Sequence, residues 1–303
     1  MAIIPPDADI LPPSDDHIFK TLLTHPNATR VLKSVVSAVI ERPVSEAHVR
    51  NTVLPGTDVD EKEQRLDVNC SIDGGDQVDV EMQCSRVEED TSDNHDGFIN
   101  KSIYYLTDLH SSQKSMGVDY HKLVRTYQVT FCAYTIFKQW PDFVSRFSLR
   151  RPTGEQVSDQ INMVVIEMNK LRARMKTPVE DISWLEAWAI FFSSADDPKK
   201  RDLINNLINT KEEIKMASEL LMEISKDERE RAIMRSRRMF QTDQFSNLQT
   251  AERRGEKRGK EEERREIVNH MHREGFDVKT IAKATRLSEQ EVKDILDSKA
   301  REQ

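Results

Sequence analysis

Hydrophobic and polar positions alternate along residues 65–84, on both sides of a Gly-Gly pair. The apolar positions are Leu66, Val68, Cys70 and Ile72 in the first half, and Val78, Val80, Met82 and Cys84 in the second. Side chains of a strand point alternately to its two faces. The pattern therefore predicts a hairpin of two strands, at about 65–72 and 77–84, with one apolar and one polar face.

The polar face of this hairpin carries three acidic residues, Asp67, Asp79 and Glu81. Two registers of the hairpin make the two apolar faces coincide. A three-residue loop places Asp67 opposite Glu81, and a five-residue loop places Asp67 opposite Gln83. Either register brings Asp67 within reach of Glu81. Facing carboxylates repel each other, and a divalent cation would turn that repulsion into ligation. The alternative is an exposed sheet face that happens to be acidic.

The rest of the chain is predicted to be mainly helical. Residues 1–15 are rich in Pro and Asp and read as irregular, and the acidic stretch 86–97 reads as a loop. Apolar residues at helical spacing, and one run rich in β-branched and aromatic residues, predict the other elements. These are helices at about 16–24, 28–41, 98–115, 159–175, 181–194 and 197–265, and a buried strand within 124–137.

Composition limits the classes of protein to which the chain can belong. It has 303 residues, of which 32 % are charged, and a formal net charge of −8. Without a basic excess, contact with nucleic acid must come from a local patch or from bound cations. No signal peptide and no membrane span are recognisable, so we expect a cytoplasmic protein. The three cysteines lie in strand-like runs and read as small core residues in a reducing compartment.

The C-terminal part is strongly charged. Residues 252–266 contain seven basic and six acidic residues, which is typical of a solvated helix or linker, and the long charged helices could alternatively support a homo-oligomer. Ser288 and Glu291 form a capping box that begins a helix, and an earlier helix ends near Gly275. The short helices resemble a helix-turn-helix, although Arg286 occupies a turn position that favours Gly. This tail would either read DNA or serve in packing and self-association.

The order of these motifs resembles the PD-(D/E)xK nuclease core, and within it the recombination-promoting nuclease (Rpn) family of transposase-like proteins. The resemblance covers about 16–140 and 250–298. It rests on DHIFKTLL at 16–23, RLDVNCSIDGGDQVDVEMQ at 65–83, KSIYYL at 101–106, GVDY at 117–120 and IAKATRLSEQEVKDIL at 281–296. It implies an α/β fold with a mixed sheet flanked by helices, followed by a mostly helical C-terminal region.

The resemblance also implies a site. Asp67 and Glu81 would be ligands of Mg²⁺ or Mn²⁺, with the main-chain carbonyl of Met82 as a further ligand. Gln83 stands where other members carry a catalytic Lys, and it can orient a water molecule but supplies no charge. Lys101, where the family more often has Arg, would supply a cation, unless it is a solvated residue in the first turn of its helix.

Five further residues are weaker candidates. Asp16 and Lys20 match the opening motif, and their alternative roles are a helix cap and a solvated lysine. Tyr104, Tyr105 and Tyr120 could contact substrate, but core packing with the hydroxyl groups at the rim is the favoured interpretation.

The leading hypothesis is a metal-dependent DNA endonuclease that promotes recombination in a bacterial cytoplasm. The rival is a catalytically weak or inactive relative that acts as a DNA- or protein-binding module, and a third idea is a protein that mainly self-associates. We expect an irregular segment over 1–15, a nuclease-like core over 16–150, a helical region over 151–250, and a charged helix with a helix-turn-helix-like tail over 251–303.

Overall fold

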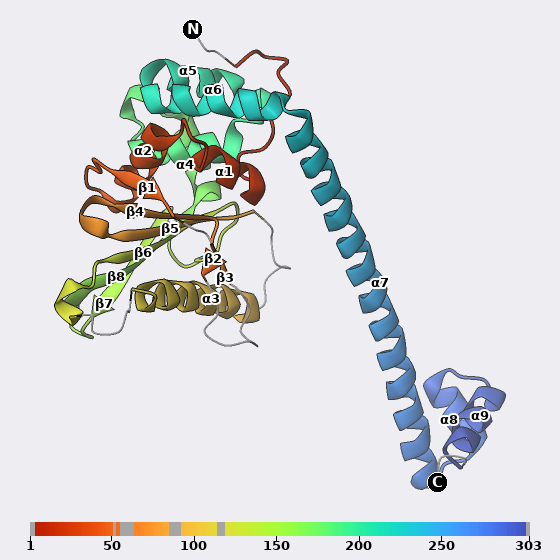
Figure 1. Ribbon diagram of the computed structural model, residues 1–303. Helices are drawn as coiled ribbons and strands as arrows, with labels where there is room; N and C mark the ends of the chain where they lie inside the picture. Colours follow the sequence, from red (N-terminus) through yellow and green to blue (C-terminus); the bar gives the residue numbers. More distant parts are fainter. Residues whose placement is uncertain (1–3, 51–52, 55–63, 85–91, 114–118, 301–303) are drawn as a thin grey trace. The chain divides into compact units, whose positions relative to one another are not determined.

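The computed structural model describes residues 4–50, 53–54, 64–84, 92–113 and 119–300 (Figure 1). The chain forms two compact units, Met1–Arg231 and Ala232–Gln303, which we describe separately. Within the described residues, no helix is both long enough and apolar enough to cross a membrane.

A mixed six-stranded sheet lies at the centre of the first unit, with the strand order β1-β4-β5-β6-β8-β7. Strands β5, β6 and β8 run parallel, and the other pairings are antiparallel. The bounds are β1 Ala47–Val49, β4 Val68–Ile72, β5 Gln77–Gln83, β6 Thr126–Cys132, β7 Val144–Arg150 and β8 Gln156–Glu167. Strands β2 (Val53–Leu54) and β3 (Gln64–Arg65) form a separate two-stranded sheet.

The β4–β5 hairpin has the first of the two registers that the sequence allows. Val68 pairs with Val80 and Asn69 with Asp79, so the same ladder continued by one residue places Asp67 opposite Glu81. The connection is the three-residue 3₁₀ turn Asp73–Gly75. Gly74 and Gly75 have φ angles of +74° and +93°, a conformation that glycine adopts without steric cost.

Helices cover both faces of the sheet (Figure 1). On one face lie α1 (Asp16–Leu23), α2 (Thr29–Ile40) and α4 (Trp184–Ser194), and on the other lies α3 (Ser92–Ser111). The rings of Phe19, Phe131 and Phe192 pack against one another with centroids 5.0–5.9 Å apart, which joins α1, β6 and α4 in one core. Helices α5 (Arg201–Thr210) and α6 (Glu212–Lys226) pack outside α4 and α2.

The prediction of a helix over 159–175 is wrong. Residues Gln156–Glu167 form β8, which lies between β6 and β7, and 3₁₀ turns follow it. Because β8 is an inner strand, Met163, Val164, Val165 and Ile166 are all buried. A strand that is buried on both faces shows a continuous apolar run, and periodicity cannot distinguish such a run from a buried helix. The core sheet therefore continues past residue 150.

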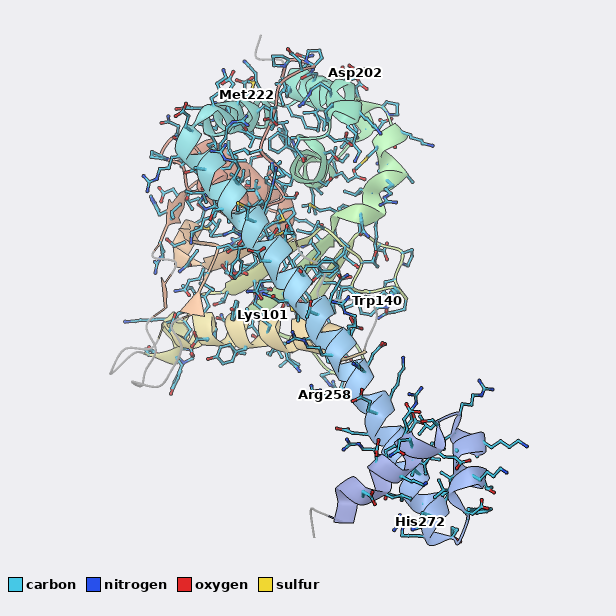
Figure 2. The ribbon with its side chains drawn as sticks, turned by 90° about the vertical axis from the view of Figure 1, so that its right-hand side faces the viewer. Lys101, Trp140, Asp202, Met222, Arg258 and His272 are labelled. Atoms are coloured by element: carbon cyan, nitrogen blue, oxygen red, sulfur yellow. The ribbon has the colours of Figure 1, made fainter. Side chains whose placement is uncertain are left out.

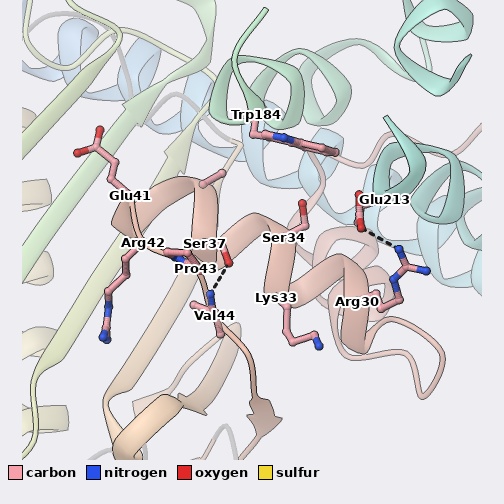
Figure 3. A pocket seen from close by; sticks show the side chains of 11 residues that line it. Arg30, Lys33, Ser34, Ser37, Glu41, Arg42, Pro43, Val44, Trp184 and Glu213 are labelled. Carbon is pink, nitrogen blue, oxygen red and sulfur yellow. Dashed lines mark hydrogen bonds and ion pairs between the residues drawn. The ribbon is translucent and has the colours of Figure 1, made fainter. Parts of the chain in front are cut away.

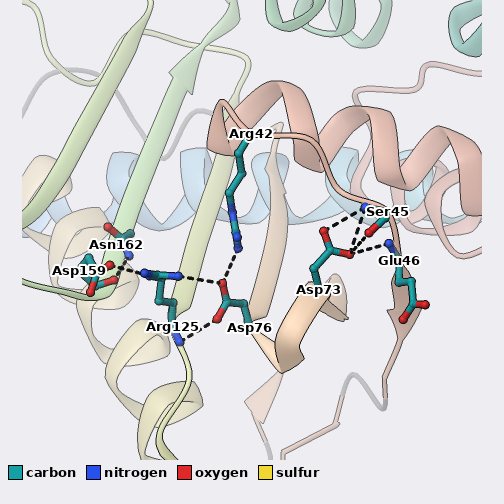
Figure 4. Close-up of polar contacts among 8 residues, drawn as sticks. All are labelled: Arg42, Ser45, Glu46, Asp73, Asp76, Arg125, Asp159 and Asn162. Carbon is teal, nitrogen blue, oxygen red and sulfur yellow. Dashed lines mark hydrogen bonds and ion pairs between the residues drawn. The ribbon is translucent and has the colours of Figure 1, made fainter.

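Ion pairs fasten the N-terminal ends of β5 and β6 (Figure 4). The buried carboxylate of Asp76 pairs with both Arg42 and Arg125 and accepts a hydrogen bond from the backbone N–H of Arg125. Arg125 also pairs with Asp159, at 2.6 Å from Nε to Oδ2. The cluster ties α2, β5, β6 and β8 together at the end of the sheet away from Gln83.

The second unit consists of most of α7 (Glu228–Arg273), α8 (Val278–Thr285) and α9 (Glu289–Ala300). Val268, Ile281, Ala282 and Val292 form its small core, near the end of α7 that Figure 2 marks with His272. The capping box is confirmed, since the N–H of Ser288 donates to Glu291 and the N–H of Glu291 donates to the hydroxyl of Ser288.

The charge of α9 bears on the two interpretations of the tail. This helix contains four acidic and two basic residues, namely Glu289, Glu291, Asp294, Asp297, Lys293 and Lys299. A helix that enters a DNA groove is repelled by phosphate if its net charge is negative. The charge of α9 therefore favours packing or self-association over DNA reading.

The turn between α8 and α9 gives a first prediction. Arg286 has a φ angle of +57°, which is strained for a residue with a Cβ atom. Replacing Arg286 by Gly should therefore raise the local free energy of unfolding of the tail by about 0.5–1 kcal/mol. Hydrogen exchange of the amides in α8 and α9 would measure this, and unchanged or faster exchange would contradict it.

Candidate functional site: a carboxylate pair at the end of β5

Asp67 and Glu81 lie side by side where β4 and β5 meet. The backbone N–H of Asp67 donates to Oε1 of Glu81 at 3.1 Å, and the N–H of Met82 donates to Oδ2 of Asp67 at 3.0 Å. Each carboxylate is therefore held by the backbone of the strand that carries the other one. The two side chains face each other, as the alternation pattern predicts.

The acidic face of the hairpin is covered. Across the parallel β5–β6 ladder, Glu81 pairs with Thr130 and Asp79 with Gln128, so these side chains share a face. Helix α3 packs on that face of β6 and β8. Glu81 is only 7 % exposed and Asp79 is fully buried. The alternative of an exposed sheet face that happens to be acidic is therefore wrong.

Asp79 also belongs to the cluster, although it was not predicted as a site residue. The alternation of polar and apolar residues correctly predicts that it shares a face with Glu81. Neither of its carboxylate oxygens meets a hydrogen-bond donor among the residues that the structure describes. Asp79 can therefore hydrogen-bond to Glu81 only when it is protonated and donates to it.

Burial raises the pKa of all three carboxyl groups. It raises the pKa of Glu81 to about 7, with a further contribution from the negative charge of Asp67. Burial, followed by the charges of Glu81 and Asp67, holds the pKa of Asp79 well above its usual value. The pKa of Asp67 is also raised by burial, against the opposing hydrogen bond from Met82. The cluster thus has more acidic groups than it can easily ionise without a cation.

Two lysines approach the cluster. Nζ of Lys101, on α3, lies 3.9 Å from Oε2 of Glu81 and 5.0 Å from the ring centre of Tyr105. Figure 2 shows Lys101 on α3, which begins at Ser92, so Lys101 lies in mid-helix and not in the first turn of its helix. Its side chain is nevertheless exposed, as the interpretation of a solvated lysine expects. Nζ of Lys20 donates to the carbonyl of Leu66 at 3.3 Å, next to Asp67.

Asp16 also acts on this cluster, because its charge raises the pKa of Asp67. It is the first residue of α1, and its alternative role as a helix cap is wrong, since Asp15 is the capping residue that accepts from the N–H of His17.

Gln83, the last residue of β5, lies beside the start of the β6–β7 connection. Its carbonyl accepts a hydrogen bond from the N–H of Ala133 at 3.0 Å. Burial raises the pKa of Tyr134 to about 12 even though a hydrogen bond between its hydroxyl group and the side chain of Gln83 opposes the shift. No sequence pattern points to Tyr134, because its position depends on the parallel pairing of β5 with β6.

The three candidate tyrosines behave differently. Tyr105 is half-buried, and this burial raises the pKa of its hydroxyl group, whereas the charge of Lys101 acts to lower it. Tyr104 and Tyr120 are 55 % and 77 % exposed, so the core packing favoured for them is wrong. Residues 117–118 of the GVDY motif lie outside the described residues.

The donor chemistry of the cluster suits a hard divalent cation. Among the described residues, no group of three or more His, Cys, Asp or Glu side chains is arranged to hold a metal. Asp67 and Glu81 nevertheless offer carboxylate oxygens and an excess of negative charge. Mg²⁺ is commonly bound through one or two carboxylates, with water and phosphate as its other ligands. The residues present therefore fit such an ion in charge and donor type.

A pocket of about 570 Å³ lies elsewhere, between α2 and Trp184 (Figure 3). Arg30, Lys33 and Arg42 contribute positive charge to it, and Arg30 pairs with Glu213 at 2.9 Å. None of the candidate site residues lines this pocket, so its shape carries no information about the carboxylate cluster.

Comparison with known protein families decides the relationship of the chain. Residues 13–251 match the model of the PD-(D/E)XK nuclease family transposases. The chain belongs to this family. The match includes α1, the β4–β5 hairpin, β8 and the start of α7, and thus all of the candidate site residues. No curated protein and no solved structure matches the chain.

Membership of the PD-(D/E)XK family, together with the mixed six-stranded sheet flanked by helices, confirms the predicted fold class. The matched region extends past residue 150, in agreement with the place of β8 inside the sheet.

The protonation of Asp79 gives a second prediction. Because burial and the charges of Glu81 and Asp67 favour the neutral form of Asp79, the neutral Asp79→Asn variant should change the free energy of unfolding at pH 7 by less than about 1 kcal/mol. Chemical denaturation at pH 7 in EDTA would measure this. A loss of several kcal/mol would mean that Asp79 is ionised and that its charge is stabilised in the folded protein.

Proposed function

We propose that this PD-(D/E)XK family member is a metal-dependent DNA endonuclease that hydrolyses phosphodiester bonds and acts in recombination. The observation that carries the proposal is the pair of the half-buried Asp67 and the buried Glu81, whose two carboxylates are fixed side by side although they repel each other. A folded protein gains no stability from such a pair, so a role in binding a cation is its simplest explanation.

Asp67 and Glu81 would hold Mg²⁺ or Mn²⁺, with the carbonyl of Met82 as a further ligand. In an extended strand the N–H and C=O of one residue point to the same side, so the Met82 carbonyl is directed to the side on which its N–H meets Asp67. A bound divalent cation lowers the pKa of water and stabilises negative charge on a phosphate.

Gln83 and Lys101 would complete the reaction site. The amide of Gln83 can orient a water molecule but cannot remove a proton from it. Lys101 supplies the positive charge that Gln83 lacks, and its position near Glu81 is suited to a phosphate bound at the same place. Local cations at the cluster would also reduce the repulsion between DNA and a protein of net charge −8.

The second candidate function is a relative with weak or no catalysis that binds DNA or protein. Two observations favour it, namely the Gln at position 83 and the acidic net charge. DNA binding without cleavage by the wild-type protein would support this alternative.

The test is a plasmid-nicking assay with Mg²⁺, with Mn²⁺ and with EDTA, on wild-type protein and on Glu81→Gln protein purified in parallel. We expect relaxed and linear products only with wild-type protein and a divalent cation. Equal nicking by both preparations would show that the cleavage does not depend on Glu81 and would discard the site assignment. Absence of nicking by wild-type protein on plasmid, linear and single-stranded DNA would reject the endonuclease.

A further inference from the structure

Helix α7 exposes large apolar side chains although it is otherwise highly charged. Phe245 and Leu248 are 60 % and 55 % exposed, and Phe240, on another side of the helix, is exposed as well. An exposed helix of a monomer usually carries polar residues all round, and a row of exposed apolar side chains indicates an interaction surface. This surface lies wholly in the second unit, from Arg238 to Glu262.

Phe245 and Leu248 are the two apolar members of a seam of eight positions that follow the spacing of a coiled coil. Steps of three and four residues alternate along the seam, which is the repeat that keeps one face of a helix toward a partner helix. Its members are Arg238, Gln241, Phe245, Leu248, Glu252, Gly255, Gly259 and Glu262.

The two glycines on the seam have no local explanation. A Cβ atom added at Gly255 or Gly259 would have no neighbour within 4 Å, and neither residue has a positive φ. Glycine inside a helix costs about 1 kcal/mol relative to alanine. A glycine on the helix surface lets another helix approach closely, or lets that helix place a large side chain over the glycine.

The distribution of charge identifies a second copy of the same helix as the occupant. In an antiparallel pair with its two-fold axis at residue 250, Arg238 lies opposite the partner's Glu262 and Phe245 lies opposite the partner's Gly255. Opposite charges and large-to-small packing thus coincide in one register. A parallel pair would instead set Arg238 against the partner's Arg238 and Glu262 against the partner's Glu262.

We propose that the seam of α7 is a homodimer interface, in which two copies of the helix pair antiparallel about residue 250. The interface is closed by its two-fold symmetry, so that each Arg238–Glu262 contact occurs twice. The methylene groups of Glu252 can cover the partner's Leu248 while its carboxylate stays in water. The interface is distinct from the carboxylate cluster and does not depend on nuclease activity.

Sedimentation velocity on the full chain, over a range of concentrations, tests the charge contact. We expect a dimer, with Arg238→Glu or Glu262→Arg weakening dimerisation at least tenfold and the double variant returning it to within about threefold of wild type. Arg254→Glu, on the opposite side of the helix, is the matched control and should leave dimerisation unchanged. A monomeric wild type, or a double variant as weak as the single ones, would overturn the proposal.

Cysteine cross-linking tests the direction of pairing. A mixture of Phe245→Cys and Gly255→Cys chains should form a disulfide-linked dimer under mild oxidation. Phe245→Cys alone should not, because in the antiparallel pair its two thiols are ten residues, or about 15 Å, apart. Cross-linking of Phe245→Cys with itself would show parallel pairing and overturn the proposal, and wild type controls for the native cysteines, of which Cys70 and Cys132 are buried.

Discussion

Replacing Asp67 by Asn, or Glu81 by Gln, is expected to lower metal-dependent plasmid nicking by at least about 10³-fold, which corresponds to about 4 kcal/mol of the activation barrier. Each substitution keeps the size of the side chain and removes a negative charge that the cation requires. The Asn and Gln amides can still accept the hydrogen bonds that now come from Met82 and Asp67. The fold should therefore survive, and the initial rate of nicking is the measurement.

Metal binding and catalysis can be separated by a readout that does not need DNA. Titration of Mn²⁺ followed by electron paramagnetic resonance should show at least tenfold weaker binding to both variants. Asp202→Asn, an exposed residue in the first turn of α5, is the matched control and should bind and nick like wild type. Unaltered Mn²⁺ binding by the Asp67 and Glu81 variants would remove both residues from the metal site, whatever their effect on nicking.

The hairpin was predictable because its information is local. The alternation of Val68 and Cys70 with polar residues determined the faces, and the Gly-Gly pair limited the register to two choices. The contact between Asp67 and Glu81 followed from either register. The surroundings of this contact were not predictable, since they depend on segments far away in the sequence.

Two examples show what the sequence lacked. The cover that α3 places over Asp79 requires knowledge of tertiary packing, so an acidic strand face looked equally compatible with solvent. In β8, the run Met163–Ile166 is apolar without interruption, because the inner strand of a mixed sheet is buried on both sides. Such a run has no period that could separate a strand from a helix.

In EDTA, the free energy of unfolding is expected to fall between pH 5 and pH 8, contrary to the usual behaviour of a protein with ion-paired carboxylates. The group responsible is Glu81, whose pKa is raised from 4.5 to about 7 in the folded protein. Between these values the folded state binds more protons than the unfolded state, so stability decreases as pH rises. The contribution of Glu81 to the free energy of unfolding is fully present below pH 4.5 and is lost as the pH rises past 7. Its magnitude is about 3 kcal/mol.

The charged groups around Glu81 act in both directions. Asp67 and Asp79 also have raised pKa values and contribute with the same sign, whereas Lys101 favours the ionised form. His110, whose pKa is lowered by burial, has the opposite effect, because folding is opposed when that ring becomes protonated below its usual pKa. Groups with lowered carboxyl pKa values, such as Asp73, affect stability only below about pH 4.

The contribution of Glu81 is therefore isolated by comparing wild type with Glu81→Gln, in which the neutral form is permanent. Urea denaturation in EDTA at pH 5 and pH 8 should show a smaller decrease for the variant, by up to about 3 kcal/mol. Mn²⁺ at pH 8 should stabilise wild type and leave the variant nearly unchanged, because only the ionised carboxylate binds the cation. If both proteins lost the same stability between pH 5 and pH 8, Glu81 would be ionised at pH 5 already, and the repulsion that a cation is proposed to relieve would not exist.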